Sequence, residues 1–182
     1  MVSIRKPQEW SSSRPFWQAC WSARSVDGVE VNGYTIEPGA NLTEANLLMA
    51  DLTGVDLRGA NLTGVDLRGA KLTGANLGQA NLTGANLDGT NLTGAKLSGA
   101  WLGQASLEGA DLREAKLTGA NLEGANLREV NLAEASLTVA FLVGANLEGA
   151  NLYRASLYRA KANEDTTLPE GFDPVAAGVT FE

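Results

Sequence analysis

Histidine is absent from the 182 residues, and cysteine occurs once, as Cys20. Without histidine the chain has neither the commonest general base nor the commonest metal ligand. A single cysteine excludes an internal disulfide and a cysteine-rich zinc site. We therefore expect no catalytic, cofactor-binding or metal-binding residues, and we expect that the protein is not an enzyme.

Aromatic residues are also scarce, at 6% of the chain, although hydrophobic residues make up 44%. A core built from this composition has to be filled by leucine and alanine. The length predicts one domain.

Positive charge is the minority charge, with 14 Lys and Arg against 21 Asp and Glu and a formal net charge of −7. A general affinity for nucleic-acid phosphates or anionic lipid needs clustered Lys and Arg, so we expect neither nucleic acid nor membrane as a partner. No apolar run is long enough to cross a membrane, and residues 1–6 lack the apolar stretch of a secretory signal. Together with the free Cys20, these features favour a cytoplasmic location.

What the sequence does contain is a five-residue repeat. Leucine occupies every fifth position from Leu42 to Leu157, 24 times in succession, and alanine stands two residues earlier in 20 of these units. Two residues of extended chain separate side chains on one face, so Ala and Leu are predicted to point inward and the residue between them outward. The last two residues of each unit are predicted to form a β-turn, in which glycine, present in 14 of the 24 last positions, supplies the positive φ of a type II turn. Where glycine is replaced, we expect corners that avoid positive φ; these are Glu114, Glu129, Glu134, Val139, Arg154 and Arg159.

Units such as Ala-Asn-Leu-Thr-Gly and Val-Asp-Leu-Arg-Gly over residues 40–159 resemble the pentapeptide-repeat family, whose pattern is A(D/N)LXX. The resemblance implies an all-β fold, a right-handed quadrilateral parallel β-helix with 20 residues per coil and about six regular coils. The segment 168–175 also resembles a closing segment of cyanobacterial members. Frequent glycine belongs to the turns here and forms no nucleotide-binding signature, so no small-molecule substrate is predicted.

Terminal caps are expected because an open β-solenoid exposes unpaired strand edges. Residues 1–39 are predicted to be an N-terminal cap, with a short helix around 13–21 and degenerate pentapeptides at 29–33 and 34–38, after which Gly39 inserts one residue. Residues 40–159 form the repeat, and residues 160–182 are predicted to be a C-terminal cap with an irregular acidic tail.

The outward residues of one column, 20 residues apart, include the two aromatic side chains Trp101 and Phe141. With Val143 beside them and Val139 at the preceding corner, they are a candidate patch for a partner or for self-association. The alternative is that the segment around Trp17 or the tail around Phe172 covers the patch.

Other outward residues have structural interpretations. A column of Leu48, Arg68, Asp88, Glu108, Arg128 and Glu148 predicts ion pairs between coils, at Arg68 with Asp88 and around Arg128. Outward asparagines, 12 of 24, are predicted to form amide ladders along the axis. Asp51, Asp56 and Asp66 lack the enclosed site that acid–base catalysis needs.

Three functions remain. The first is a rigid protein-interaction scaffold or regulator with an unidentified partner. The second is a DNA mimic that inhibits or protects DNA gyrase or topoisomerase, as the family resemblance allows; it is weakened because residues 40–159 carry 12 acidic and nine basic residues, a net charge of only −3. The third is a mechanical spacer whose length is its function.

Overall fold

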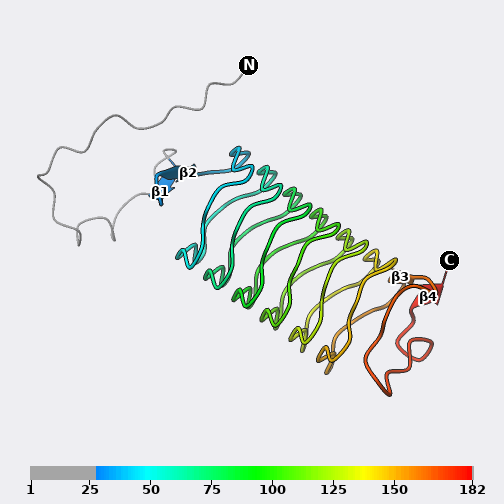
Figure 1. Ribbon diagram of the computed structural model, residues 1–182. Helices are drawn as coiled ribbons and strands as arrows, with labels where there is room; N and C mark the ends of the chain where they lie inside the picture. Colours follow the sequence, from blue (N-terminus) through cyan, green and yellow to red (C-terminus); the bar gives the residue numbers. More distant parts are fainter. Residues whose placement is uncertain (1–27, 182) are drawn as a thin grey trace, which may run out of the picture.

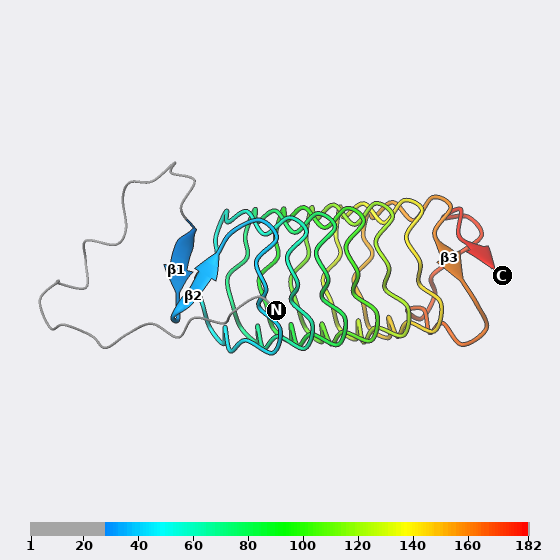
Figure 2. The same ribbon diagram turned by 90° about the horizontal axis from the view of Figure 1, so that it is seen from above.

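The computed structural model describes residues 28–181, which form a rod of stacked coils with short strands at its two ends (Figures 1 and 2). At the N-terminal end are β1 (Val29–Val31) and β2 (Tyr34–Ile36), and at the other end are β3 (Lys161–Ala162) and β4 (Thr180–Phe181). No helix is found in the part of the chain described.

Each coil takes up 20 residues. Asn41 forms a parallel β-bridge with Asn61, and the same step recurs in the ladders that begin at Asn46, Asp51 and Asp56. Since these four outward positions precede Asn61, one coil contains four pentapeptides.

Backbone hydrogen bonds between coils explain why one conformation recurs. In the unit that begins at Ala60, the second residue donates its N–H back to Ala40 at 2.9 Å, and the third and fifth residues donate forward to Asn81 at 2.7 Å and Thr83 at 3.1 Å. The first residue of the following unit closes the turn by donating to the leucine carbonyl three residues earlier. Only the N–H of the fourth residue has no backbone partner in this pattern.

Leucine and alanine fill the interior, as predicted. Every repeat leucine from Leu47 to Leu147 is at most 1% exposed. Thr90 replaces an inward alanine and is also buried, because its hydroxyl donates to the Leu67 carbonyl at 2.8 Å. Towards the C-terminal end the enclosure is less complete, and Leu152 is half-buried.

The expectation that corners without glycine avoid positive φ is wrong. All six of the residues concerned have φ between 52° and 61°. At five of the six, the N–H donates to a carbonyl further along the chain, as the Glu114 N–H does to the Ala133 carbonyl of the next coil at 3.0 Å. Arg154, near the C-terminal end, has the same conformation without such a bond among the described residues. Stacking thus keeps a backbone that non-glycine residues rarely adopt alone.

The expectation of degenerate pentapeptides at 29–33 and 34–38 is wrong. β1 and β2 instead pair antiparallel in a hairpin. The loop is Asn32-Gly33, with φ of 50° and 78°, and positive φ at both loop residues is the property of a type I′ turn. Gly39 is not an inserted residue either: its φ is 73°, and its N–H donates to the Arg58 carbonyl at 2.9 Å like any other corner. The expected helix around 13–21 lies outside the described residues.

The C-terminal segment packs against the last coil, although apart from β3, β4 and one bridge it consists of turns and irregular chain. Lys161 continues the ladder by bridging Phe141, and β3 pairs in parallel with β4. Val179 is only 8% exposed. Three further side chains pack against the core from this segment, namely Leu168, Phe172 and Ala177. These apolar contacts therefore hold the segment across the end of the last coil.

Candidate functional site

Trp101 and Phe141 lie on the same ladder, as predicted. Trp101 bridges Asn121, and Asn121 bridges Phe141, so the two aromatic side chains are two coils apart on one face. Trp101 is 58% exposed and Phe141 is 41% exposed. Large apolar side chains with this exposure form a candidate contact surface.

Trp101 stands between two hollows in the surface. One has a volume of about 580 Å³ and runs toward the C-terminal end, and the other, of about 460 Å³, runs toward the N-terminal end past Asn81 and Asn61. The larger hollow is lined by Trp101 together with Gly103, Glu123, Val143 and Asp165. We call this hollow the Trp101 groove.

The predicted patch is only partly brought together. Val143 is half-buried and lines the Trp101 groove, whereas Phe141 does not line it. Phe141 instead lies under the Lys161 ammonium, which is 5.3 Å from the ring centroid, a cation–π distance. Val139 is 41% exposed at the preceding corner.

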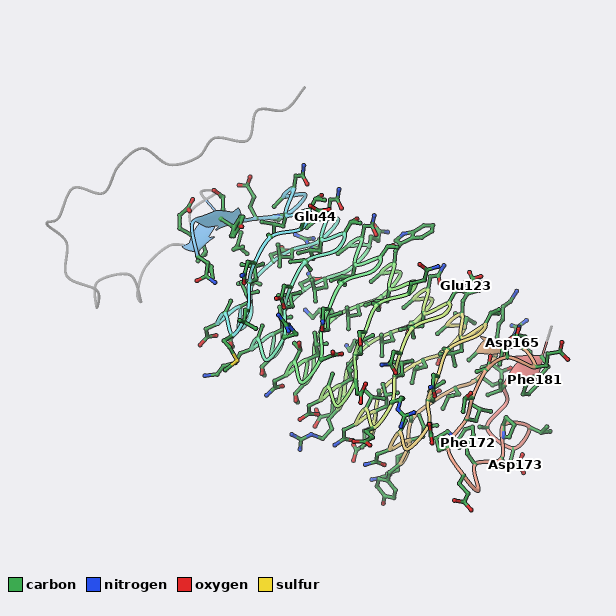
Figure 3. All side chains as sticks on the ribbon, viewed as in Figure 1. Glu44, Glu123, Asp165, Phe172, Asp173 and Phe181 are labelled. Carbon is green, nitrogen blue, oxygen red and sulfur yellow. The ribbon has the colours of Figure 1, made fainter. Side chains whose placement is uncertain are left out.

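The described C-terminal tail does not cover Trp101, whose exposure remains high. Phe172 is partly buried against the core, and Figure 3 shows it across the rod from Glu123 and Asp165, two residues of the Trp101 groove. The segment around Trp17, the other predicted cover, lies outside the described residues. Sequence reasoning missed Glu123 and Asp165, which give the groove an acidic rim; the 20-residue spacing that places Glu123 beside Val143 was the available signal.

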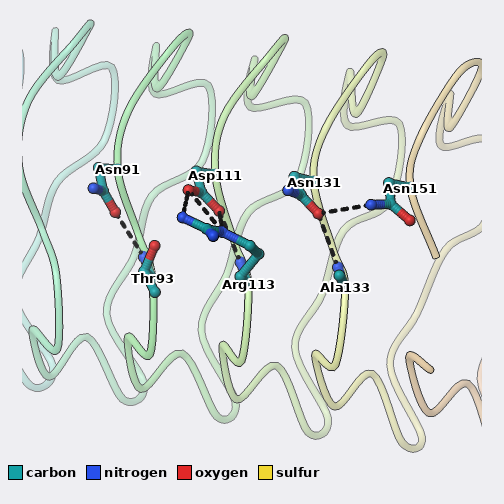
Figure 4. A network of polar contacts seen from close by, with 7 residues as sticks. All are labelled: Asn91, Thr93, Asp111, Arg113, Asn131, Ala133 and Asn151. Carbon is teal, nitrogen blue, oxygen red and sulfur yellow. Dashed lines mark hydrogen bonds and ion pairs between the residues drawn. The ribbon is translucent and has the colours of Figure 1, made fainter. Parts of the chain in front are cut away.

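The asparagine side chains do not form the predicted amide ladders. In every unit whose outward residue is Asn or Asp, 16 in all, the Oδ1 atom accepts a hydrogen bond from the N–H two residues later, at 2.8–3.3 Å. This is the N–H that the backbone pattern leaves over. Among the described residues, an amide–amide bond between coils joins only Asn151 to Asn131, at 3.2 Å (Figure 4). We refer to the Oδ1 bond within a unit as the side-chain cap.

Three aspartates combine the side-chain cap with a salt bridge. Asp56, Asp66 and Asp111 each bind the arginine two residues later with N–O distances of 2.7 Å. Hydrogen bonds from these arginines hold the pKa of each aspartate below its ordinary value. Hydrogen bonds from Thr53 likewise lower the pKa of Asp51. These carboxylates remain charged near neutral pH, which is unsuited to a general acid.

Of the ion pairs predicted between coils, the one around Arg128 is confirmed and the one between Arg68 and Asp88 is wrong. Arg128 pairs with Glu148 of the next coil at 2.6 Å. Arg68 does not pair with Asp88, because Asp66 in its own unit is within reach and binds it at 2.7 Å. The Asp88 carboxylate accepts instead from the Ser106 hydroxyl at 2.6 Å and from the Glu108 N–H at 3.0 Å.

Residues 28–181 contain neither a cluster of metal ligands nor a membrane-spanning helix. No three or more Asp, Glu and Cys side chains gather there as metal ligands would. None of these residues belongs to a helix able to span a bilayer.

Comparison with protein families gives a match to the family described as pentapeptide repeats, in eight copies. The matched residues are 39–59, 60–99, 90–129, 105–138 and 131–164. No match was found among curated proteins.

Several solved structures are similar to this chain. The pentapeptide repeat protein Rfr23 of the cyanobacterium Cyanothece 51142 is 39% identical, with a TM-score of 0.44, over 56% of this chain and 65% of that one. HetL, from the cyanobacterium Nostoc sp. strain PCC 7120 and involved in heterocyst differentiation regulation, is 32% identical, with a TM-score of 0.29, over 69% of this chain and 73% of that one. QnrB1, a plasmid-mediated fluoroquinolone resistance protein, is 14% identical, with a TM-score of 0.34, over 80% of this chain and 91% of that one.

Proposed function

The chain belongs to the pentapeptide-repeat family, and from this premise we propose that it is a non-enzymatic, rigid scaffold or regulator that presents the Trp101 groove to a protein partner. One observation carries the proposal: a tryptophan that is 58% exposed lies between two hollows on a face whose backbone is bonded to both neighbouring coils. Tryptophan is among the residues most enriched where protein interfaces derive their affinity.

We also propose that the coil is the right-handed quadrilateral parallel β-helix implied by the family. Four pentapeptides in each 20-residue coil support the four-sided section. Such a rod holds its faces at fixed angles, which suits a scaffold because little conformational entropy is lost on binding.

The groove suggests what the partner contact contains. Its rim carries the carboxylates of Glu123 and Asp165, and the Trp101 ring offers a π face. On the same ladder Lys161 already lies over Phe141. A lysine or arginine side chain of the partner would therefore suit the groove.

DNA mimicry, the second candidate, has less support. A mimic needs rows of carboxylates that act as phosphates do. Here three of the four outward aspartates are paired with the arginine two residues later, at Arg58, Arg68 and Arg113.

Site-specific photocrosslinking tests the scaffold proposal. A photoreactive residue at position 123, in the Trp101 groove, should capture a protein that the same residue at position 53, on another ladder, does not capture. After that protein is identified and purified, its affinity is measured by calorimetry for two variants. Trp101→Asn, which installs the outward residue of the neighbouring coils, should weaken binding about tenfold or more.

Tyr153→Ala is the matched control, because Tyr153 is 65% exposed and lies on a different ladder. Its affinity should stay within about twofold of the parent. Equal loss in both variants, or none in Trp101→Asn, would contradict a Trp101-centred contact.

A further inference from the structure

The side-chain cap is missing from eight of the 24 units, those whose outward residue is neither Asn nor Asp. In one of them the Glu108 N–H is bonded by Asp88 of the preceding coil. The other seven N–H groups have no acceptor within residues 28–181; they belong to Thr73, Ser98, Gly103, Thr118, Thr138, Val143 and Tyr158.

Four of these seven follow one another on a single face. Their units have Lys96, Lys116, Ser136 and Ser156 as outward residues, and these residues form one continuous bridge ladder. The four N–H groups, of Ser98, Thr118, Thr138 and Tyr158, therefore recur on consecutive coils about 4.8 Å apart. We call them the donor row.

Other donors surround the donor row. Lys96 and Lys116 are exposed and adjacent on the ladder. Ser and Thr hydroxyls connect the coils beyond them, Thr118 to Ser136 at 3.2 Å and Thr138 to Ser156 at 3.1 Å. The four units of the donor row contain three basic residues and no acidic one, in a chain whose net charge is −7.

Two carboxylates lie at the neighbouring corner, on Glu114 and Glu134. Glu134 is 3.9 Å from Arg154, so part of its charge is offset. Along the ladder, Asp56 is bound by Arg58. The net positive charge of the donor-row units is thus offset mainly by the Glu114 carboxylate.

In three regular units, the equivalent N–H group is bonded to a carboxylate oxygen. At Asp56, Asp66 and Asp111 the acceptor Oδ1 is an anionic oxygen that lies 3.2 Å from the backbone nitrogen and also accepts from an arginine Nε at 2.9 Å. The site of the side-chain cap therefore accommodates a charged oxygen together with a cation. Charge-assisted bonds of this kind are the stronger ones.

We propose that the first half of the donor row, the N–H groups of Ser98 and Thr118 with the ammonium groups of Lys96 and Lys116, binds the phosphate group of a small soluble ligand. Each of the two N–H groups donates to one oxygen of the same phosphate. Because two oxygens of one phosphate are closer together than the two N–H groups, they lie between the places that Oδ1 atoms occupy in the regular units, and the two bonds converge. The remaining oxygens are left to the two lysines. This site is on a different face from the Trp101 groove and does not depend on the proposed scaffold function.

Amide NMR during titration with inorganic phosphate tests the proposal in the full chain. The Ser98 and Thr118 amide signals should shift and saturate, and those of Thr73 should not. Thr73 is the internal control because its unit also has an outward lysine, Lys71, and an uncapped N–H, but its ladder neighbours are Asp51 and Asn91. Sodium chloride at matched ionic strength corrects for screening.

A second titration with glycerol phosphate distinguishes free phosphate from a phosphate ester. Tighter binding of the ester assigns the site to phosphorylated metabolites, and tighter binding of inorganic phosphate assigns it to the free ion. Saturable shifts at Ser98 and Thr118 in either titration support the proposal.

A variant that fills the site with the protein's own side-chain caps separates binding from folding. Lys96→Asn with Lys116→Asn should keep or raise the melting temperature and lower phosphate affinity about tenfold or more. Lys71→Asn should leave the affinity within about twofold.

Ser136→Asn with Ser156→Asn keeps both lysines and should leave the Ser98 and Thr118 response in place. The proposal is overturned if sodium chloride reproduces the shifts, if Thr73 responds equally, or if the double lysine variant binds phosphate as tightly as the parent.

Discussion

The Asp111 carboxylate accepts hydrogen bonds from both the backbone N–H and the guanidinium of Arg113, at 3.2 Å and 2.7–3.0 Å. The Asp111 side chain thus satisfies the backbone N–H of its corner, and the Arg113 guanidinium neutralises the charge of the Asp111 carboxylate. Figure 4 shows the same place filled on neighbouring coils by Asn91 and Asn131, whose Oδ1 atoms accept from Thr93 and Ala133. Exchange between Asn and Asp at the outward position thus retains the side-chain cap.

The paired aspartates predict a dependence of stability on acid. Side-chain hydrogen bonds from the arginines depress the folded-state pKa of Asp56, Asp66 and Asp111. Their contribution is fully present above the unfolded pKa of about 3.9 and is lost as the pH falls through the lower folded values. The melting temperature should therefore fall when the pH is lowered from about 5 to about 2.

Replacing all three by asparagine keeps an acceptor for each backbone N–H but removes the titration. The melting temperature of this triple variant should depend less steeply on pH over the same range, as followed by circular dichroism. An identical slope in the two proteins would contradict the assignment.

Asn131→Ala tests the side-chain cap. It removes the acceptor of the Ala133 N–H and the bond to Asn151, so urea unfolding should show a loss of about 1 kcal/mol. Lys71→Ala is the control, since the Lys71 side chain cannot accept a hydrogen bond, and it should change the free energy of unfolding by less than about 0.5 kcal/mol. Equal effects would show that these bonds add nothing to stability.

Adjacent inward and outward positions should respond very differently to truncation. Leu97 is fully buried, whereas its neighbour Lys96 is exposed. Leu97→Ala should cost about 2–5 kcal/mol, and Lys96→Ala about 0.5 kcal/mol or less. Chemical unfolding measures both, and a small loss for Leu97→Ala would mean that the coils collapse to fill the cavity.

The corners at Gly119 and Val139 lie in the same position one coil apart, with φ of 66° and 52°. No atom lies within 4 Å of a Cβ built on Gly119, so a side chain there meets backbone strain rather than a clash. Gly119→Val should destabilise the fold by about 1–2 kcal/mol, and Val139→Gly should stabilise it by up to about 1 kcal/mol, in thermal unfolding. The opposite signs would be inconsistent with a strained corner at Val139.

The core could be predicted from the sequence because Ala and Leu two residues apart have one arrangement that buries both, and the buried series Leu47 to Leu147 follows it. The position of Trp101 and Phe141 on one face could also be predicted, but only because the family resemblance implied a 20-residue coil. Local sequence preferences do not predict the backbone conformation where hydrogen bonds to a neighbouring coil determine it. Glu114 has positive φ because its N–H must reach Ala133, a bond that propensity at one corner does not contain.

At residues 29–36 a local signal outweighs the five-residue spacing. Asn32-Gly33 favours a two-residue hairpin loop, and β1 and β2 pair accordingly. Cap interactions within a unit were also predictable in principle, since Asn and Asp commonly bond the N–H two residues later. The face that lacks side-chain caps is the one on which consecutive units have neither Asn nor Asp at the outward position.

The 20-residue step between bridged residues limits how such a chain can change length. A duplication of one full coil adds a layer and returns every later side chain to its original face, so Trp101 and Phe141 would stay aligned with one more residue between them on the ladder. A duplication of a single pentapeptide between them preserves every core contact type and every turn, yet rotates all that follows by a quarter of the circumference. Phe141, Lys161 and the closing segment would then face a different side from Trp101. Growth by whole coils conserves surfaces, and growth by single repeats creates new ones.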